Sequence, residues 1–169
     1  MKEEKVLLNA TVVFLVKKNK VLLGKKTRGI GRGRLNGPGG GIEEGEDIRK
    51  SATREVFEET GVKVLPDALE KVAIVHFHNI RDGLEKFICR CHIFITKEWE
   101  GEPQNTNELT GQEWFDINDL PLDRMMASDK EWLSIALKKK IIAHSYIGEE
   151  QAILVKPTEI IEMDFFPKD

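Results

Sequence analysis

The sequence predicts a single α/β domain, spanning residues 1–169, that is built around a mixed β-sheet. The length of 169 residues fits one domain with one sizeable core. Two segments, 47–60 and 128–140, have the composition of helices. Strand-like apolar segments lie on both sides of these helices without a regular βαβ alternation, and this order favours a mixed sheet over a parallel one.

The N-terminal part predicts a β-hairpin followed by a shaped loop. Residues 6–16 are almost continuously apolar, as in a strand that is covered on both faces. The polar turn KKNK leads into a second strand over residues 21–24. Residues 29–41, GIGRGRLNGPGGG, contain so many glycines that we expect a loop with a specific backbone shape.

The middle of the chain predicts a helix over 47–60 that ends at Gly61, a residue type that favours the C′ position. Residues 72–77 and 84–96 then read as two strands around the turn RDG. The polar stretch 97–112 indicates an exposed loop, and residues 113–116 indicate one more short strand.

The C-terminal part predicts a second helix and several short strands. Ser128 and Glu131 have the spacing of a capping box for a helix over 128–140, whose last three residues are lysines that suit the helix dipole. Three strands, 141–146, 151–155 and 158–163, are expected after it, with GEE at 148–150 as a turn.

Composition bounds the class of protein. The formal net charge of −3 gives no indication of a nucleic-acid surface. The apolar N-terminal segment is too short to span a bilayer, so no membrane partner is expected. We expect Cys89 and Cys91, two residues apart on a strand, to point to opposite faces as free thiols rather than to form a disulfide framework. A reducing cytoplasm is the predicted location.

A cluster of basic residues lies beside the glycine-rich loop and predicts local binding of phosphates, although a solvated hairpin face explains its first members equally well. The cluster consists of Lys17, Lys18, Lys20, Lys25, Lys26, Arg28, Arg32 and Arg34.

Three glutamates of the first predicted helix indicate a cation site. At about 100° per residue, Glu55, Glu58 and Glu59 fall within an arc of roughly 100° on one helix face. Like charges so close repel one another, and a bound divalent cation would neutralise them. Because no Cys or His joins the set, the oxygen ligands favour Mg²⁺ or Mn²⁺. The alternative is a solvated acidic helix with basic neighbours.

The segment around these glutamates resembles the Nudix box of the Nudix hydrolase family. The resemblance covers nine specified positions in a fixed register: Gly40, Glu46, Arg54, Glu55, Val56, Glu58, Glu59, Gly61 and Val62. It implies an α/β/α sandwich fold. It also implies an enzyme that hydrolyses a phosphoanhydride bond in a nucleoside diphosphate linked to another group.

The same resemblance implies roles for individual residues. Glu55, Glu58 and Glu59 would hold metal ions together with the carbonyl of Gly39. Arg54 would orient the glutamates, since a guanidinium fork suits carboxylates. Glu46 would support the site from its edge.

A further acidic ligand and a phosphate contact are expected outside the box. Glu108 in the polar loop is our candidate for the late carboxylate, with Glu113 as its rival; either one can instead be a solvated loop acid. Lys26 faces the glycine-rich loop and is expected to meet a phosphate, unless it is an ordinary surface lysine.

Beyond the box, segments 22–46, 114–126 and 129–140 resemble the MutT-like branch of the family, which acts on oxidised purine nucleoside triphosphates such as 8-oxo-dGTP and releases pyrophosphate and the monophosphate. By this resemblance, the base pocket would contain Asn36, Phe77, Asp129 and Trp132.

Each of these four residues also has a plain structural explanation. Asn36 suits a turn before glycine, Asp129 complements a helix N-terminus, and the two aromatic residues can pack in the core. The same fold can instead act on undamaged dNTPs, ADP-ribose, dinucleotides or nucleotide sugars, or serve only to bind nucleotides. The sequence carries no signal for oligomeric state.

Four residues depart from the pattern of the branch. Ile30 and Leu35 stand where aromatic residues are expected, Met126 replaces a stacking tryptophan, and Ser128 replaces the first of two neighbouring aspartates. Because stacking on an aromatic side chain is worth roughly 1–3 kcal/mol per base in nucleic-acid systems, we expect a weaker preference for the oxidised base.

Overall fold

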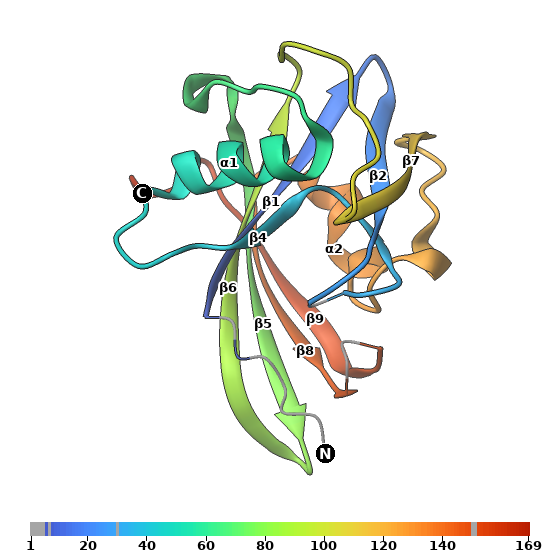
Figure 1. Cartoon of the computed structure of the whole chain (residues 1–169). Helices are drawn as coiled ribbons and strands as arrows, with labels where there is room; N and C mark the ends of the chain where they lie inside the picture. The colour runs from blue at the N-terminus through green and yellow to red at the C-terminus, as the bar shows by residue number, and fades with distance from the viewer. Residues whose placement is uncertain (1–5, 7, 30, 150–151) are drawn as a thin grey trace.

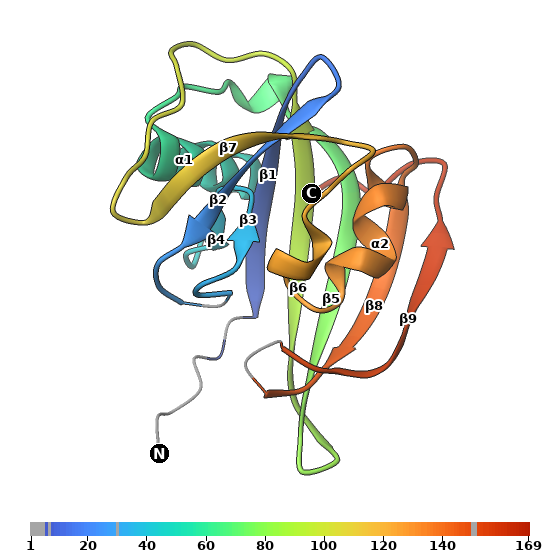
Figure 2. The same ribbon diagram turned by 90° about the vertical axis from the view of Figure 1, so that its right-hand side faces the viewer.

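Two helices lie on opposite faces of one mixed β-sheet in the computed structural model, which describes residues 6, 8–29, 31–149 and 152–169 (Figures 1 and 2). The strands are β1 Asn9–Lys17, β2 Lys20–Lys26, β3 Leu35–Asn36, β4 Gly39–Gly41, β5 Glu70–Arg81, β6 Leu84–Thr96, β7 Leu109–Asp116, β8 Ile141–Ile147 and β9 Leu154–Glu162. The helices are α1 Ile48–Thr60 and α2 Asp129–Ala136, with short 3₁₀ turns at Pro66–Ala68 and Leu122–Arg124.

The sheet combines parallel and antiparallel pairs, as the sequence predicts. Its main order is β3-β2-β1-β6-β5-β8-β9, with β4 paired to β1 and β7 paired to β2. β1 runs parallel to β6 and β5 parallel to β8, whereas the hairpins β1–β2, β5–β6 and β8–β9 are antiparallel.

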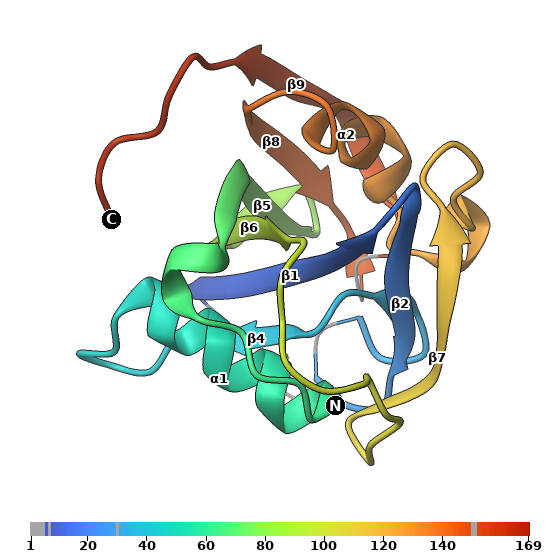
Figure 3. The same cartoon turned by 90° about the horizontal axis from the view of Figure 1, so that it is seen from above.

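The core has two layers because successive side chains of a strand point to opposite faces. On β1, Val13 and Leu15 pack in the layer that contains Val56 of α1. Phe14 of the same strand packs in the layer that contains Trp132 of α2. Seen from above, the strands lie between the two helices (Figure 3), and the α/β/α sandwich is confirmed.

The first helix begins and ends where its sequence predicts. The Oδ1 atom of Asp47 accepts a hydrogen bond of 3.0 Å from the backbone N–H of Lys50, and this N-cap fixes the first turn. Gly61 adopts φ 79°, the left-handed conformation that glycine tolerates best, and ends the helix. These caps fix the register of the glutamates between them.

The second helix is shorter than the sequence predicts, and its capping box is wrong. Helix α2 ends at Ala136, and the Ser128 side chain forms no capping hydrogen bond. Glu131 instead accepts a 2.8 Å hydrogen bond from the backbone N–H of Thr158 on β9. A contact with a distant strand has replaced the local one.

Strand pairing explains the other differences. Strand β7 begins at Leu109, inside the predicted loop, because Lys26 of β2 pairs with Leu109. The last two predicted strands form one strand, β9, while residues 150 and 151 of the predicted turn and strand lie outside the described residues.

Cys89 and Cys91 are buried free thiols, as predicted, but the prediction that they point to opposite faces was wrong, because both lie in the same core layer. Residues i and i+2 of a strand share a face, so the spacing itself places the two side chains together. Among the described residues, no helix has both the length and the apolar character that crossing a membrane requires.

Candidate active site

The three glutamates of α1 divide between its buried side and its exposed edge. Glu55 and Glu59 are one helical turn apart and are both buried, Glu59 with only 1% of its surface exposed. Glu58 lies between them in sequence and keeps 46% of its side chain exposed. The caps of α1 therefore hold one carboxylate toward solvent and two against the sheet.

Arg54 holds the acidic groups in place. Its Nε and a terminal nitrogen donate to the two carboxylate oxygens of Glu46 at 2.7 and 3.0 Å, a bidentate arrangement. The other terminal nitrogen donates to Glu55 at 3.1 Å and to Glu58 at 3.2 Å. One guanidinium thus contacts three carboxylates, and it holds the pKa of Glu46 at about 2.

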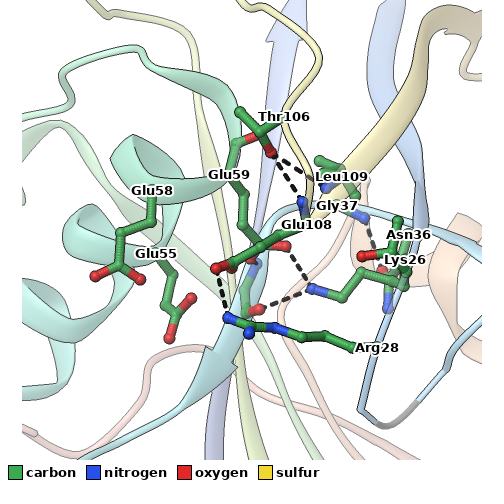
Figure 4. A network of polar contacts seen from close by, with 12 residues as sticks. Lys26, Arg28, Asn36, Gly37, Glu55, Glu58, Glu59, Thr106, Glu108 and Leu109 are labelled. Carbon is green, nitrogen blue, oxygen red and sulfur yellow. Dashed lines mark hydrogen bonds and ion pairs between the residues drawn. The ribbon is translucent and has the colours of Figure 1, made fainter.

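Glu55, Glu58 and Glu108 form a compact acidic trio (Figure 4). One carboxylate oxygen from each lies within 4.8 Å of the others. Such an oxygen-only donor set fits a hard divalent cation such as Mg²⁺ or Mn²⁺. Glu113, the alternative to Glu108, is exposed on β7 opposite Leu23, and the trio does not include it.

Thr106 holds the loop of Glu108 against the end of α1. Its hydroxyl donates to the Glu59 carbonyl at 2.9 Å and accepts from the backbone N–H groups of Glu108 and Leu109 (Figure 4). The late carboxylate is therefore positioned by backbone contacts to the helix that carries the other two.

Glu59 has different surroundings from the trio. Its Oε1 accepts from Lys26 Nζ at 2.6 Å, and its Oε2 accepts from the backbone N–H of Gly39 at 2.8 Å. Lys26 also donates to the Gly39 carbonyl at 2.8 Å. The residues expected to contact metal and phosphate, Glu59, Gly39 and Lys26, contact one another in this structure.

Burial changes the acidity of the glutamates on the inner side of α1. Desolvation raises the pKa of Glu59 to about 7, although Lys26 and the Gly39 N–H oppose this shift. Desolvation also raises the pKa of Glu55, while Arg54 lowers it. Both groups are therefore easier to protonate than ordinary glutamates.

A pocket opens beside Gly39 and Gly40, on the α2 side of the sheet. The site residues expected at a base, Asn36, Phe77, Asp129 and Trp132, all line it, together with Lys26. The other lining residues are Ala10, Thr11, Val12, Gly37, Cys89, Cys91, Ile93, Asn79, Met126 and Ile147. Most of this lining is apolar, with few polar groups, which is the usual character of a small-molecule site.

Three polar residues of the pocket, Thr11, Asp129 and Trp132, are deeply buried. Burial raises the pKa of Asp129 to about 7, and its Oδ2 accepts from the backbone N–H of Met126 at 3.2 Å. The Nε1 of Trp132 and the Oγ1 of Thr11 are buried without a hydrogen-bond partner. Asn36 Oδ1 accepts from the backbone N–H of Gly37 at 2.8 Å, as its turn position predicts, and its amide nitrogen faces Met126 Sδ at 4.0 Å.

Sequence reasoning did not identify Thr11, Asn79, Cys89 or Cys91 as pocket residues. Alternation places Cys89 and Cys91 on one face of β6, but only the strand order shows that this face lies beside β1 and β5, which carry Thr11 and Asn79. Thr106 was also missed, because its contacts join segments 47 residues apart.

Comparison with known proteins agrees with this geometry. The sequence matches the NUDIX domain over residues 6–134. It is 41% identical over 130 residues to the oxidized purine nucleoside triphosphate hydrolase of Danio rerio, covering 77% of this chain and 80% of that protein. It is 36% identical to the enzyme of the same name from Mus musculus, covering 85% and 89% of the two chains.

A solved structure shows the same fold. The mutator MutT protein from Bacillus halodurans superposes with a TM-score of 0.75 at 26% identity, covering 91% of this chain and 97% of that one. The matched domain, the two relatives and the arrangement of the box residues agree: the chain belongs to the Nudix hydrolase family.

Proposed function

We propose that this protein is a Mg²⁺-dependent nucleoside triphosphate pyrophosphohydrolase that acts on oxidised purine nucleotides such as 8-oxo-dGTP and releases the monophosphate and pyrophosphate. The observation that carries the proposal is the junction at Gly39 and Gly40. Both residues line the pocket, and the backbone N–H of Gly39 donates a hydrogen bond to Glu59. A Cβ atom on Gly40 would lie only 2.6 Å from Oε1 of Glu55. A nucleotide whose base lies in the pocket would thus place its phosphates beside the carboxylates.

The relatives support the choice of substrate. Both curated relatives are named for hydrolysis of oxidized purine nucleoside triphosphates, and each is covered over most of its length. Asn36 and Asp129 provide an amide and a carboxyl group toward the pocket, which can donate to and accept from a purine edge.

In the proposed mechanism, Glu55, Glu58 and Glu108 would hold a divalent cation. When bound, such an ion neutralises phosphoryl charge and makes water a better nucleophile. Arg54 keeps Glu55 and Glu58 oriented, and a carboxylate of the cluster accepts the proton of the attacking water. Lys26 keeps the buried Glu59 in place next to Gly39.

The pocket itself favours a second candidate, an undamaged nucleotide. Met126, which has a flexible thioether side chain, lines the pocket where the MutT-like branch has a stacking aromatic residue. Ser128 has a buried hydroxyl group where that branch has a carboxylate. Weaker stacking and one fewer carboxylate reduce the discrimination between oxidised and normal purines.

The two buried free thiols suit a reducing compartment, so we propose the cytoplasm as the location.

Steady-state kinetics test the proposal. We expect kcat/KM with Mg²⁺ to be highest for 8-oxo-dGTP in a set that also contains dGTP, dATP, dCTP, ADP-ribose and a dinucleoside polyphosphate, with pyrophosphate as product. Highest turnover of dGTP would support the second candidate, and highest turnover of ADP-ribose or the dinucleotide would overturn the proposed base pocket.

A matched pair of variants tests the metal site. Glu58→Gln removes one carboxylate of the trio and should reduce kcat by at least about 100-fold, since metal positioning and charge neutralisation supply most of the rate in phosphoryl transfer. Glu113→Gln makes the same chemical change on exposed β7 and should leave kcat within about twofold of wild type, as surface changes usually do. Full activity of Glu58→Gln would contradict the proposed site.

A further inference from the structure

Arg28 is an exposed cation that contacts the acidic trio directly. It lies in the loop after β2, and its terminal nitrogen is 2.5 Å from Oε1 of Glu108 (Figure 4). Its side chain is 75% exposed, whereas that of Glu108 is 31% exposed. Arg28 therefore reaches from solvent to a carboxylate that also faces Glu55 and Glu58.

The position of Glu108 does not depend on this ion pair. The Glu108 carbonyl accepts from the backbone N–H of Thr27 at 3.3 Å, and the Thr27 hydroxyl donates to the carbonyl of Asn107 at 2.6 Å. On the other side, Thr106 anchors the same loop to the end of α1. The backbone thus presents the Glu108 carboxylate to the trio, and Arg28 occupies one of its oxygens.

The other two cations of the site are held much more firmly. Lys26 contacts both the buried Glu59 and the Gly39 carbonyl, and only 13% of its side chain is exposed. Arg54 contacts three carboxylates. For Arg28 the only side-chain hydrogen bond or ion pair found within the described residues is with Glu108. Exposed ion pairs of this kind contribute about 0–1 kcal/mol, so exchanging this one costs little.

A divalent ion held by the trio would compete with the Arg28 guanidinium for Glu108. Both need an oxygen of the same carboxylate, and an ion with two positive charges next to the guanidinium adds like-charge repulsion. An ion bound by the trio would thus release Arg28 at the edge of the site. The released guanidinium presents five N–H donors in a planar fork that matches phosphate oxygens.

We propose that Arg28 exchanges partners during binding: it neutralises Glu108 in the metal-free protein, is displaced by the divalent ion, and then binds the phosphate chain of the nucleotide. The proposal rests on the proposed function, because that function places a triphosphate beside the trio. It assigns Arg28 a substrate-binding role that couples occupation of the metal site to recognition of the phosphates.

The proposal predicts opposite effects of one substitution on two affinities. Arg28→Gln removes the competitor of the ion, so the nucleotide-free variant should bind Mn²⁺ about three- to tenfold more tightly than wild type in calorimetric or paramagnetic titrations. The same variant should bind a non-hydrolysable α,β-methylene analogue of dGTP, with Mg²⁺ present, about tenfold more weakly. A merely structural residue would weaken both affinities together.

Arg124→Gln is the matched control. Arg124 is an exposed arginine outside the basic cluster and outside the pocket lining, so its substitution removes the same charge away from the phosphate-binding region. We expect both affinities of this variant to stay within about twofold of wild type, as surface substitutions usually leave them. In a Glu108→Gln background, Arg28→Gln should no longer increase the affinity for Mn²⁺, because the carboxylate that both cations use is gone.

Several results would overturn the proposal. An unchanged or weaker Mn²⁺ affinity in Arg28→Gln would show that Arg28 does not compete for Glu108. An unchanged affinity for the analogue, in an enzyme that hydrolyses triphosphates, would show that Arg28 does not bind phosphates although the proposed function holds. If the wild-type protein binds no triphosphate analogue, the proposed function fails, and the phosphate-binding half of this proposal fails with it.

Discussion

Lys26 and Glu59 form an ion pair of 2.6 Å that joins strand β2 to the last turn of helix α1. The side chain of Glu59 is 1% exposed and that of Lys26 is 13% exposed, so both charges lie largely outside bulk water. The Gly39 backbone completes the arrangement by donating to Glu59 and accepting from Lys26. This pair connects helix α1, which carries Glu55 and Glu58, to the end of strand β2 that borders the pocket.

A double-mutant cycle should reveal strong coupling in this pair. Lys26→Met leaves the Glu59 carboxylate buried without its cation, a change that typically costs about 3–5 kcal/mol. Adding Glu59→Gln removes the stranded charge, so the double variant should recover most of the lost free energy of unfolding. Urea denaturation of the four proteins at pH 8 measures this. Additive losses would show that the pair does not act as a unit.

Two neighbouring glycines should respond differently to alanine. A Cβ atom on Gly40 would meet the carboxylate of Glu55 at 2.6 Å, and this carboxylate is the flexible end of a side chain that can move aside. Gly40→Ala should therefore fold but bind Mn²⁺ at least about tenfold more weakly, because Glu55 leaves the trio. Calorimetric titration measures the affinity, and wild-type Mn²⁺ affinity in this variant would separate Glu55 from the metal site.

Gly39→Ala provides the contrast. Its Cβ atom would lie 2.0 Å from the backbone carbonyl oxygen of Thr11, which cannot move without disturbing the pairing of β1 with β4. We expect a loss of more than about 2 kcal/mol in the free energy of unfolding, as for other strongly overpacked core positions. Thermal and urea unfolding of both variants compare them directly. Equal stability of the two variants would show that the loop backbone adjusts freely.

Local pattern and long-range pairing account for what the sequence could and could not predict. The caps Asp47 and Gly61 fix helix α1, so the clustering of Glu55 and Glu58 followed from helical spacing alone. Glu108 joins them through the pairing of β7 with β2 and the contact of Thr106 with α1, which connect segments far apart in sequence.

The same distinction explains the errors and omissions. The capping box of α2 is absent because Glu131 contacts Thr158 of β9, a partner that local spacing cannot show. The contact of Lys26 with Glu59 likewise depends on how β2 and α1 pack, so the sequence could name both residues without pairing them. The error with Cys89 and Cys91 was different, since their spacing already places them on one face.

His92 should make the protein less stable as the pH falls. Burial, with Lys71 and Arg90 nearby, lowers the pKa of this histidine to about 4 in the folded protein, and its Nδ1 has no hydrogen-bond partner. An unfolded chain takes up the proton near pH 6.5, so below that pH the unfolded state binds more protons and is favoured. At 1.36 kcal/mol per pKa unit, we expect wild type to lose about 1–2 kcal/mol more than His92→Gln between pH 7.5 and 5. Equal pH slopes of the unfolding free energy in the two proteins would contradict this.

Asp129 has the opposite dependence on pH. Burial raises its pKa from 3.8 to about 7 in the folded protein, so between these values the unfolded chain is ionised while the folded protein retains the proton. The resulting destabilisation grows as the pH rises from about 4 and is largest above about 7. Asp129→Asn removes it and keeps an oxygen that can accept the Met126 N–H.

This substitution should therefore raise the free energy of unfolding by about 1–3 kcal/mol more at pH 8 than at pH 5, from 1.36 kcal/mol per pKa unit with allowance for relaxation. It should also raise KM for the purine substrate, since the pocket loses its carboxylate. Asp123→Asn makes the same change at an exposed position near α2 and should alter neither quantity. A pH-independent gain in Asp129→Asn would mean that Asp129 is not buried as an ionisable group. An unchanged KM together with the expected gain in the free energy of unfolding would mean that the burial of Asp129 serves packing rather than recognition of the base.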